Sequence, residues 1–224
     1  MSADPYKIFG VGLNKTGTTS LAEAFEVLGL GPVASHGGEA ANHEAVHAAL
    51  DGDYQPALDY ASRFRAFEDR PWNVGTIYRA LATHFPDARF VLTLRQPERW
   101  WGSVERWLSV SKPGKRDEYC RHLRVDPALA NAGVEALQVP MLARYREYND
   151  AVIQHFEGTQ RLLVVDFEAG DGWPELSAFF GTPPPDVPFP MANRQHYDAR
   201  DHRIRAETLF KKARRRLSRW GLRR

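Results

Sequence analysis

The sequence has little cysteine and no long apolar run. Its one cysteine, Cys120, excludes an internal disulfide framework and any metal site built from several cysteines. No apolar run approaches the roughly 20 residues that a membrane-spanning helix requires. The first seven residues mix an acid, a proline and a base, which does not match a secretory signal peptide. We therefore expect a cytoplasmic protein.

The composition is that of one folded domain with a basic end. Of 224 residues, 43% are apolar and 26% charged, and twelve Phe, eight Tyr and six Trp supply large side chains for a core. We expect a single domain over 1–224. The last 22 residues, 203–224, hold ten Lys or Arg and one acid, a net charge of +9, whereas the remaining chain carries −7. Apolar residues at helical spacing there predict a basic C-terminal helix over 200–224.

Short apolar runs alternate with amphipathic stretches along the chain. The alternation predicts an α/β fold, with a central parallel sheet of about four or five strands between two helix layers. Strands are expected at 6–13, 32–35, 66–68, 89–94 and 161–167. Helices are expected at 20–28, 39–50, 56–63, 74–84, 98–108, 139–156 and 173–180.

A Gly/Thr/Lys loop lies between the first strand and the first helix. Backbone N–H groups at a helix N-terminus bind anions, and Gly17 allows a phosphate to approach the backbone closely. Lys15 adds a positive charge, and the hydroxyls of Thr16, Thr18, Thr19 and Ser20 can donate to oxygens. The spacing Gly12-x-x-x-x-Gly17 mimics a nucleotide-triphosphate loop, but Thr18 stands where that motif has Lys. We predict a phosphate loop of another kind.

A second candidate phosphate site follows the strand at 89–94. Arg95 ends this strand, and Ser103 lies eight residues later in the next helix. The carboxyl ends of strands in a doubly wound sheet gather ligands, so these residues are expected to face the same crevice as the loop. A guanidinium and a hydroxyl suit a separate phosphate.

Taken together, the two motifs resemble the sulfotransferase family. The resemblance rests on Gly12 to Leu21, on Phe90 to Arg95 with Trp100-Trp101-Gly102-Ser103, and on Phe189-Pro190 with Asn193. It implies a P-loop NTPase-like sulfotransferase fold. It also implies that the loop holds the 5′-phosphosulfate of PAPS (3′-phosphoadenosine 5′-phosphosulfate), and that Arg95 and Ser103 hold its 3′-phosphate. Hormone-type members carry Trp where this chain has Ser20, so their adenine contact and acceptor pocket are not carried over.

Sulfuryl transfer requires stabilisation of the leaving phosphate and a base for the acceptor. Lys15 can stabilise charge on the bridging oxygen, and we expect no metal because the leaving nucleotide is a stable anion. Asp69, after a short strand, is a candidate for the base; the alternative role for it is a helix cap. His36 is a second candidate. The acceptor is expected to be a small molecule or a glycan.

Three other functions stay open at this point. His43-Glu44-Ala45-Val46-His47 matches the zinc-hydrolase pattern His-Glu-x-x-His, but the continuation of that motif is missing and a solvated helix face is the simpler explanation. A P-loop nucleotide or small-molecule kinase shares the fold, but the displaced lysine argues against it. The basic tail suits weak contact with an anionic surface or a non-enzymatic nucleic-acid binder, yet no recognised nucleic-acid module is present and no specific nucleic acid is expected.

Overall fold

The strands of the described residues form one parallel sheet. The computed structural model describes residues 6–34 and 40–191. Its strands are β1 (Ile8–Gly10), β2 (Val33–Ala34), β3 (Ala66–Phe67), β4 (Arg89–Thr93) and β5 (Leu162–Val165). They pair in the order β2-β3-β1-β4-β5, and every pairing is parallel. The predicted α/β class and parallel sheet are confirmed.

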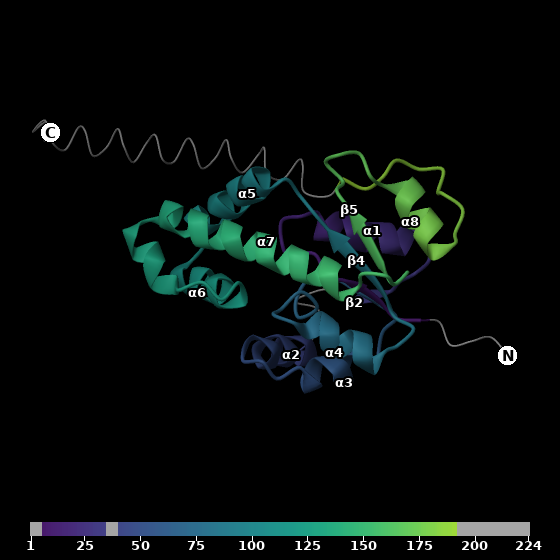
Figure 1. The fold of residues 1–224 in the computed structure, drawn as a ribbon, viewed down its shortest axis with the longest axis horizontal. Helices are drawn as coiled ribbons and strands as arrows, with labels where there is room; N and C mark the ends of the chain where they lie inside the picture. Colours follow the sequence, from purple (N-terminus) through teal and green to yellow (C-terminus); the bar gives the residue numbers. More distant parts are fainter. Residues whose placement is uncertain (1–5, 35–39, 192–224) are drawn as a thin grey trace, which may run out of the picture. The chain divides into compact units, whose positions relative to one another are not determined.

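Helices cover both faces of this sheet (Figure 1). They are α1 (Thr18–Val27), α2 (Ala40–Leu50), α3 (Gln55–Ala61), α4 (Ile77–His84), α5 (Pro97–Val110), α6 (Pro113–His122), α7 (Gln138–His155) and α8 (Trp173–Phe180), with 3₁₀ turns at Pro127–Ala132 and Val134–Leu137. Successive side chains of a strand point to opposite faces. Ile8 and Val91 accordingly pack with α1 and α8, whereas Phe9 and Phe90 pack with α3, α4 and the end of α7.

Aromatic rings dominate the face of the sheet that α3 and α4 cover. Phe9 is fully buried and stacks on Phe67 of the neighbouring strand, with ring centroids 4.8 Å apart. Trp72 lies against both rings, at 5.5 Å from Phe9 and 4.6 Å from Phe67. Truncating such a ring to alanine costs about 3–5 kcal/mol. This packing fixes the ends of β1 and β3, from which two of the candidate site segments leave the sheet.

A separate group of helices packs beyond the carboxyl end of β1. Leu13, three residues after the strand, is buried in a cluster with α5, α6 and α7. Trp100 and Tyr145 stack in this cluster with centroids 4.3 Å apart. Val11 is still buried in the core on the side of α3 and α4, whereas Leu13 enters this helical cluster, and β1 ends at Gly10 and is shorter than the predicted strand.

Internal contacts divide the chain into one unit from Met1 to Pro190 and a second from Met191 to Arg224. Every element named above belongs to the first unit. The basic helix predicted over 200–224 lies outside the described residues, as does Ser35 at the end of the predicted second strand. The single domain over 1–224 stays a prediction.

Candidate functional site

The loop between β1 and α1 is shaped by two residues with positive φ. Lys15 has a φ of 74° and Gly17 a φ of 102°. A Cβ at position 17 would stand 2.9 Å from the ring of Phe167, so both conformation and space require glycine there. Helix α1 begins at Thr18, and the N–H groups of a first helical turn point out of the helix. The loop therefore places a helix N-terminus where it can bind an anion.

Side chains from two distant elements, β4 and α5, help to hold this loop. The Thr16 hydroxyl donates to the Leu13 carbonyl at 2.6 Å and contacts the Thr93 hydroxyl at 2.5 Å. Trp100 Nε1 donates to the Asn14 carbonyl at 2.9 Å. Since Thr16 is buried and its hydroxyl is used inside the loop, this side chain supports the loop and is not placed to donate to a phosphate. The predicted place of Thr16 in the cofactor site, for instance through its backbone, stays a prediction.

Arg95 lies directly against the loop. Its Nη1 donates to the Lys15 carbonyl at 3.2 Å, and its Nη2 contacts Glu168 Oε1 at 2.5 Å. Tyr145 of α7 holds the Arg95 backbone by two hydrogen bonds. Its hydroxyl accepts from Arg95 N at 2.9 Å and donates to Arg95 O at 2.6 Å. The end of β4 and the loop after β1 are thus neighbours, as expected from the parallel order of the strands.

Asp69 reaches the loop from the end of β3. Asn14 Nδ2 donates to Asp69 Oδ1, although the two residues are 55 positions apart. Arg70 N donates to the same oxygen at 2.8 Å. Asp69 has a φ of 63°, so it and Lys15 are two of the three non-glycine residues with positive φ within the described ranges. Such strained residues gather at functional sites, where the surrounding structure maintains them.

The remaining predicted site residues within the described ranges lie in the loop itself and on helices α1 and α5. The Lys15 ammonium lies 5.3 Å from the ring centroid of Trp107 on α5, and Lys15 is half-buried. Ser103 is buried on α5, two turns after Arg95. Three hydroxyl residues occupy the first turn of α1: Thr18 and Ser20 are buried, and Thr19 is exposed. His36, the second candidate base, lies outside the described residues.

Helix α6 forms a polar wall beside Asp69 that the sequence analysis did not single out. Glu118 accepts from Arg70 Nη1 and from Lys115 Nζ, the latter at 2.9 Å. Burial raises the pKa of Glu118, but these hydrogen bonds outweigh it and bring the value to about 2. His122 Nε2 donates to the Asn73 carbonyl at 3.0 Å, and burial lowers the pKa of His122 to about 4. The only sequence signal for this wall is the spacing of residues 118, 119 and 122, which places them on one face of a helix.

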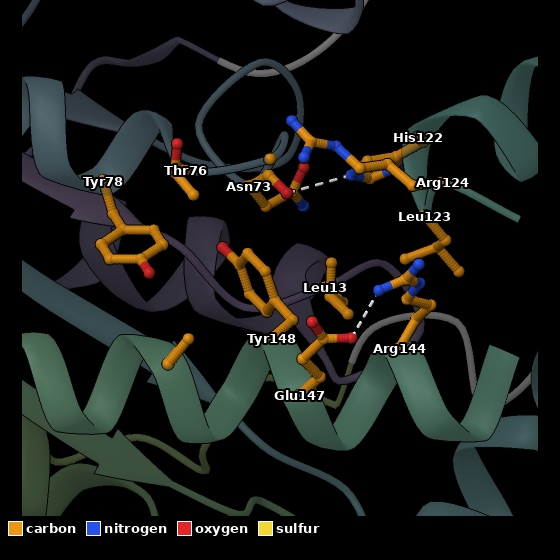
Figure 2. Close-up of a pocket in the computed structure, with 12 residues that line it drawn as sticks. Leu13, Asn73, Thr76, Tyr78, His122, Leu123, Arg124, Arg144, Glu147 and Tyr148 are labelled. Carbon is orange, nitrogen blue, oxygen red and sulfur yellow. Dashed lines mark hydrogen bonds and ion pairs between the residues drawn. The ribbon is translucent and has the colours of Figure 1, made fainter. Parts of the chain in front are cut away.

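A pocket of about 130 Å³ adjoins the loop on the side of α7. In Figure 2, Tyr148 stands between Tyr78 on one side and Leu13 on the other. Tyr148 also donates to the Val11 carbonyl at 2.7 Å, which ties α7 to the start of the loop. Neither Lys15 nor Asp69 lines this pocket, so it borders the loop without reaching the two candidate reactive groups.

Comparison with known families gives one match over most of the chain. A family model described as a sulfotransferase domain matches residues 7–197. The chain belongs to the sulfotransferase family. This identifies the protein as a transferase, and a search of curated proteins gave no match. The matched segment contains the loop, Asp69, Arg95 and Ser103 of this sulfotransferase, together with the whole described sheet.

The structure also bears on the zinc-hydrolase alternative and on membrane-spanning helices. His43 and His47 are both exposed on α2. Within residues 6–34 and 40–191, no group of three or more His, Cys, Asp or Glu side chains is arranged to hold a metal ion. In the same part of the chain, no helix is long and apolar enough to cross a membrane.

Proposed function

We propose that this sulfotransferase transfers a sulfuryl group from PAPS to a hydroxyl or amine of an acceptor. The observation that carries the proposal is the hydrogen bond of 3.2 Å between Arg95 Nη1 and the Lys15 carbonyl. It puts a guanidinium beside a helix N-terminus, and the two groups suit the two phosphate positions of one bisphosphorylated nucleotide. A ligand with a single phosphate would leave one of them unused.

The loop supplies the groups that the donor end of PAPS requires. Lys15 and the first-turn amides of α1 would hold the phosphosulfate, with Gly17 leaving the backbone accessible. Arg95 and Ser103 would hold the 3′-phosphate. As charge develops on the leaving phosphate oxygen, the Lys15 ammonium stabilises it; removing one such donor typically lowers kcat by about 10² to 10³.

Asp69 is the base that the geometry favours. Its Oδ1 is held by Asn14 of the loop and by Arg70 N, so the carboxylate lies next to the anion cradle and is fixed in orientation. An acceptor O–H or N–H gives its proton to Asp69 while the acceptor atom forms a bond to sulfur. The bond between sulfur and the bridging oxygen breaks, and PAP, the 3′,5′-bisphosphate of adenosine, leaves with the electron pair.

Calorimetry with PAP and with ATP–Mg²⁺ tests the donor. We expect metal-independent binding of PAP, and a loss of about tenfold or more in Lys15→Ala and in Arg95→Ala, because each removes charge-assisted hydrogen bonds. Lys112→Ala and Arg146→Ala remove the same charges from exposed sites and serve as matched controls. Preference for ATP–Mg²⁺ over PAP would favour the kinase function instead.

Turnover of PAPS tests the base. Asp69→Asn keeps the Oδ1 that accepts from Asn14 but cannot take a proton. With an acceptor found by screening hydroxyl and amine compounds, we expect kcat to fall by about 10² to 10⁴ while PAP affinity stays unchanged. An Asp69→Asn variant that retains full kcat would remove Asp69 from the mechanism and leave the donor site standing.

A further inference from the structure

Two arginines converge on one carboxylate at the proposed 3′-phosphate site. Glu168, in the segment after β5, accepts from Arg95 Nη2 on Oε1 at 2.5 Å and from Arg99 Nη1 on Oε2 at 3.4 Å. Arg95 ends β4, and Arg99 lies in the first turn of α5, one helical turn further along the chain. Each carboxylate oxygen thus contacts a different guanidinium.

A carboxylate and a phosphate compete for the same donors. Guanidinium groups bind both anions through paired charge-assisted N–H···O bonds, and a phosphate offers more charge and more oxygens. The Glu168 side chain is 34% exposed and that of Arg99 is 68% exposed. The exposed Arg99 contact is weak and screened by salt, whereas the Arg95 side chain is 24% exposed, so its contact with Glu168 is the one that a nucleotide phosphate has to outcompete.

The backbone of Glu168 is anchored, so only its side chain has to move. Asp166 Oδ1 accepts from Glu168 N at 2.9 Å. The preceding residue, Phe167, packs against Phe189 with ring centroids 4.7 Å apart and lies over Gly17. Replacement of the carboxylate therefore requires a rotation of the Glu168 side chain and leaves the anion loop in place.

We propose that Glu168 occupies the position of the 3′-phosphate and that Arg99 is the second arginine of the phosphate clamp. The inference rests on the proposed function, because it assumes that Arg95 binds the 3′-phosphate of PAPS. Arg99 is then a nucleotide-binding residue, and Glu168 is an internal competitor whose carboxylate the 3′-phosphate has to displace from Arg95 and Arg99.

Nucleotides with and without a 3′-phosphate test this. PAP and AMP differ by that group alone, so calorimetry with both, at one low salt concentration, isolates it. Glu168→Gln removes the competing charge, and we expect about fivefold tighter PAP binding with AMP affinity unchanged. Arg99→Gln removes a ligand, and we expect about tenfold weaker PAP binding, again with AMP unchanged.

Matched controls come from a neighbouring ion pair. Arg146 Nη2 contacts Glu98 Oε1 at 3.4 Å, the same distance as the Arg99–Glu168 contact, and both side chains are exposed. Glu98→Gln and Arg146→Gln therefore report the effect of the charge change alone. Full-length protein is used throughout, and folding of each variant is checked by its urea unfolding midpoint.

The outcomes separate this inference from the proposed function. PAP affinity in Glu168→Gln equal to or weaker than in Glu98→Gln would overturn the competing role of Glu168. PAP affinity in Arg99→Gln equal to that in Arg146→Gln would overturn the role of Arg99. In either of these outcomes the unmodified protein would still bind PAP, so the proposed function would stand. If the unmodified protein binds neither nucleotide, the proposed function itself fails.

Discussion

We expect the burial of His122 to make the protein less stable in mild acid. The ring is 4% exposed, and its Nε2–H donates to the Asn73 carbonyl at 3.0 Å. Burial lowers the pKa of His122 to about 4, although the hydrogen bond to Asn73 favours the charged form. The unfolded chain takes up a proton on this residue near pH 6.5, whereas the folded protein does so only near pH 4.

The sign and size follow from these two pKa values. The stabilising effect of the neutral His122 ring is fully present above pH 6.5 and is lost as the pH falls from 6.5 to 4, because only the unfolded chain is protonated in that range. The gap between the two values corresponds to about 3 kcal/mol in the free energy of unfolding. Such a loss is a large fraction of the stability of a typical domain.

Urea unfolding between pH 7 and pH 4.5 measures the effect. His122→Gln retains an amide N–H that can reach the Asn73 carbonyl but does not titrate. We expect the unmodified protein to lose more free energy of unfolding across this range than His122→Gln, by about 2–3 kcal/mol. The exposed His84 provides the control His84→Gln, which should keep the pH dependence. Parallel pH profiles for the unmodified protein and His122→Gln would show that protonation of His122 does not cause the loss of stability.

Two further predictions concern the anion loop. Thr16 gives its only hydroxyl proton to a loop carbonyl, so Thr93 must donate to Thr16. Thr16→Val therefore leaves a buried donor unpaired and should cost about 2 kcal/mol in urea unfolding, against about 1 kcal/mol for Thr93→Val; equal costs would contradict this donor assignment. Gly17→Ala should weaken PAP binding about tenfold or more in calorimetry, because of its positive φ and its contact with Phe167, whereas Gly102→Ala, in open space on α5, should not.

The sequence predicted regular elements best where burial and hydrophobic pattern agree. The helix over 173–180 has the predicted bounds, and the strand predicted at 89–94 is observed at Arg89–Thr93. The first strand was predicted too long because apolar character marks burial and does not distinguish sheet pairing from helix packing. Val11 and Leu13 are buried, but Leu13 packs into the α5–α7 cluster.

The candidate site was partly predictable for a topological reason. Parallel strands bring their carboxyl ends to one edge, which placed Lys15 and Arg95 together before any contact was known, whereas Asp69 was placed near them by the family resemblance. The Glu168 carboxylate was missed because its contact with Arg95 joins residues 73 positions apart, through a segment without regular structure. The inward orientation of the Thr16 hydroxyl was missed as well, since a motif gives residue types and not the direction of a side chain.

A crystal structure with bound PAP would locate both phosphates of the nucleotide at once. We expect the 5′-phosphate at the first-turn amides of α1 beside Lys15. We expect the 3′-phosphate within hydrogen-bond distance of the Arg95 guanidinium, with the Glu168 side chain turned away. A PAP molecule whose two phosphates both lie away from Arg95 and the loop would rule out the proposed donor site.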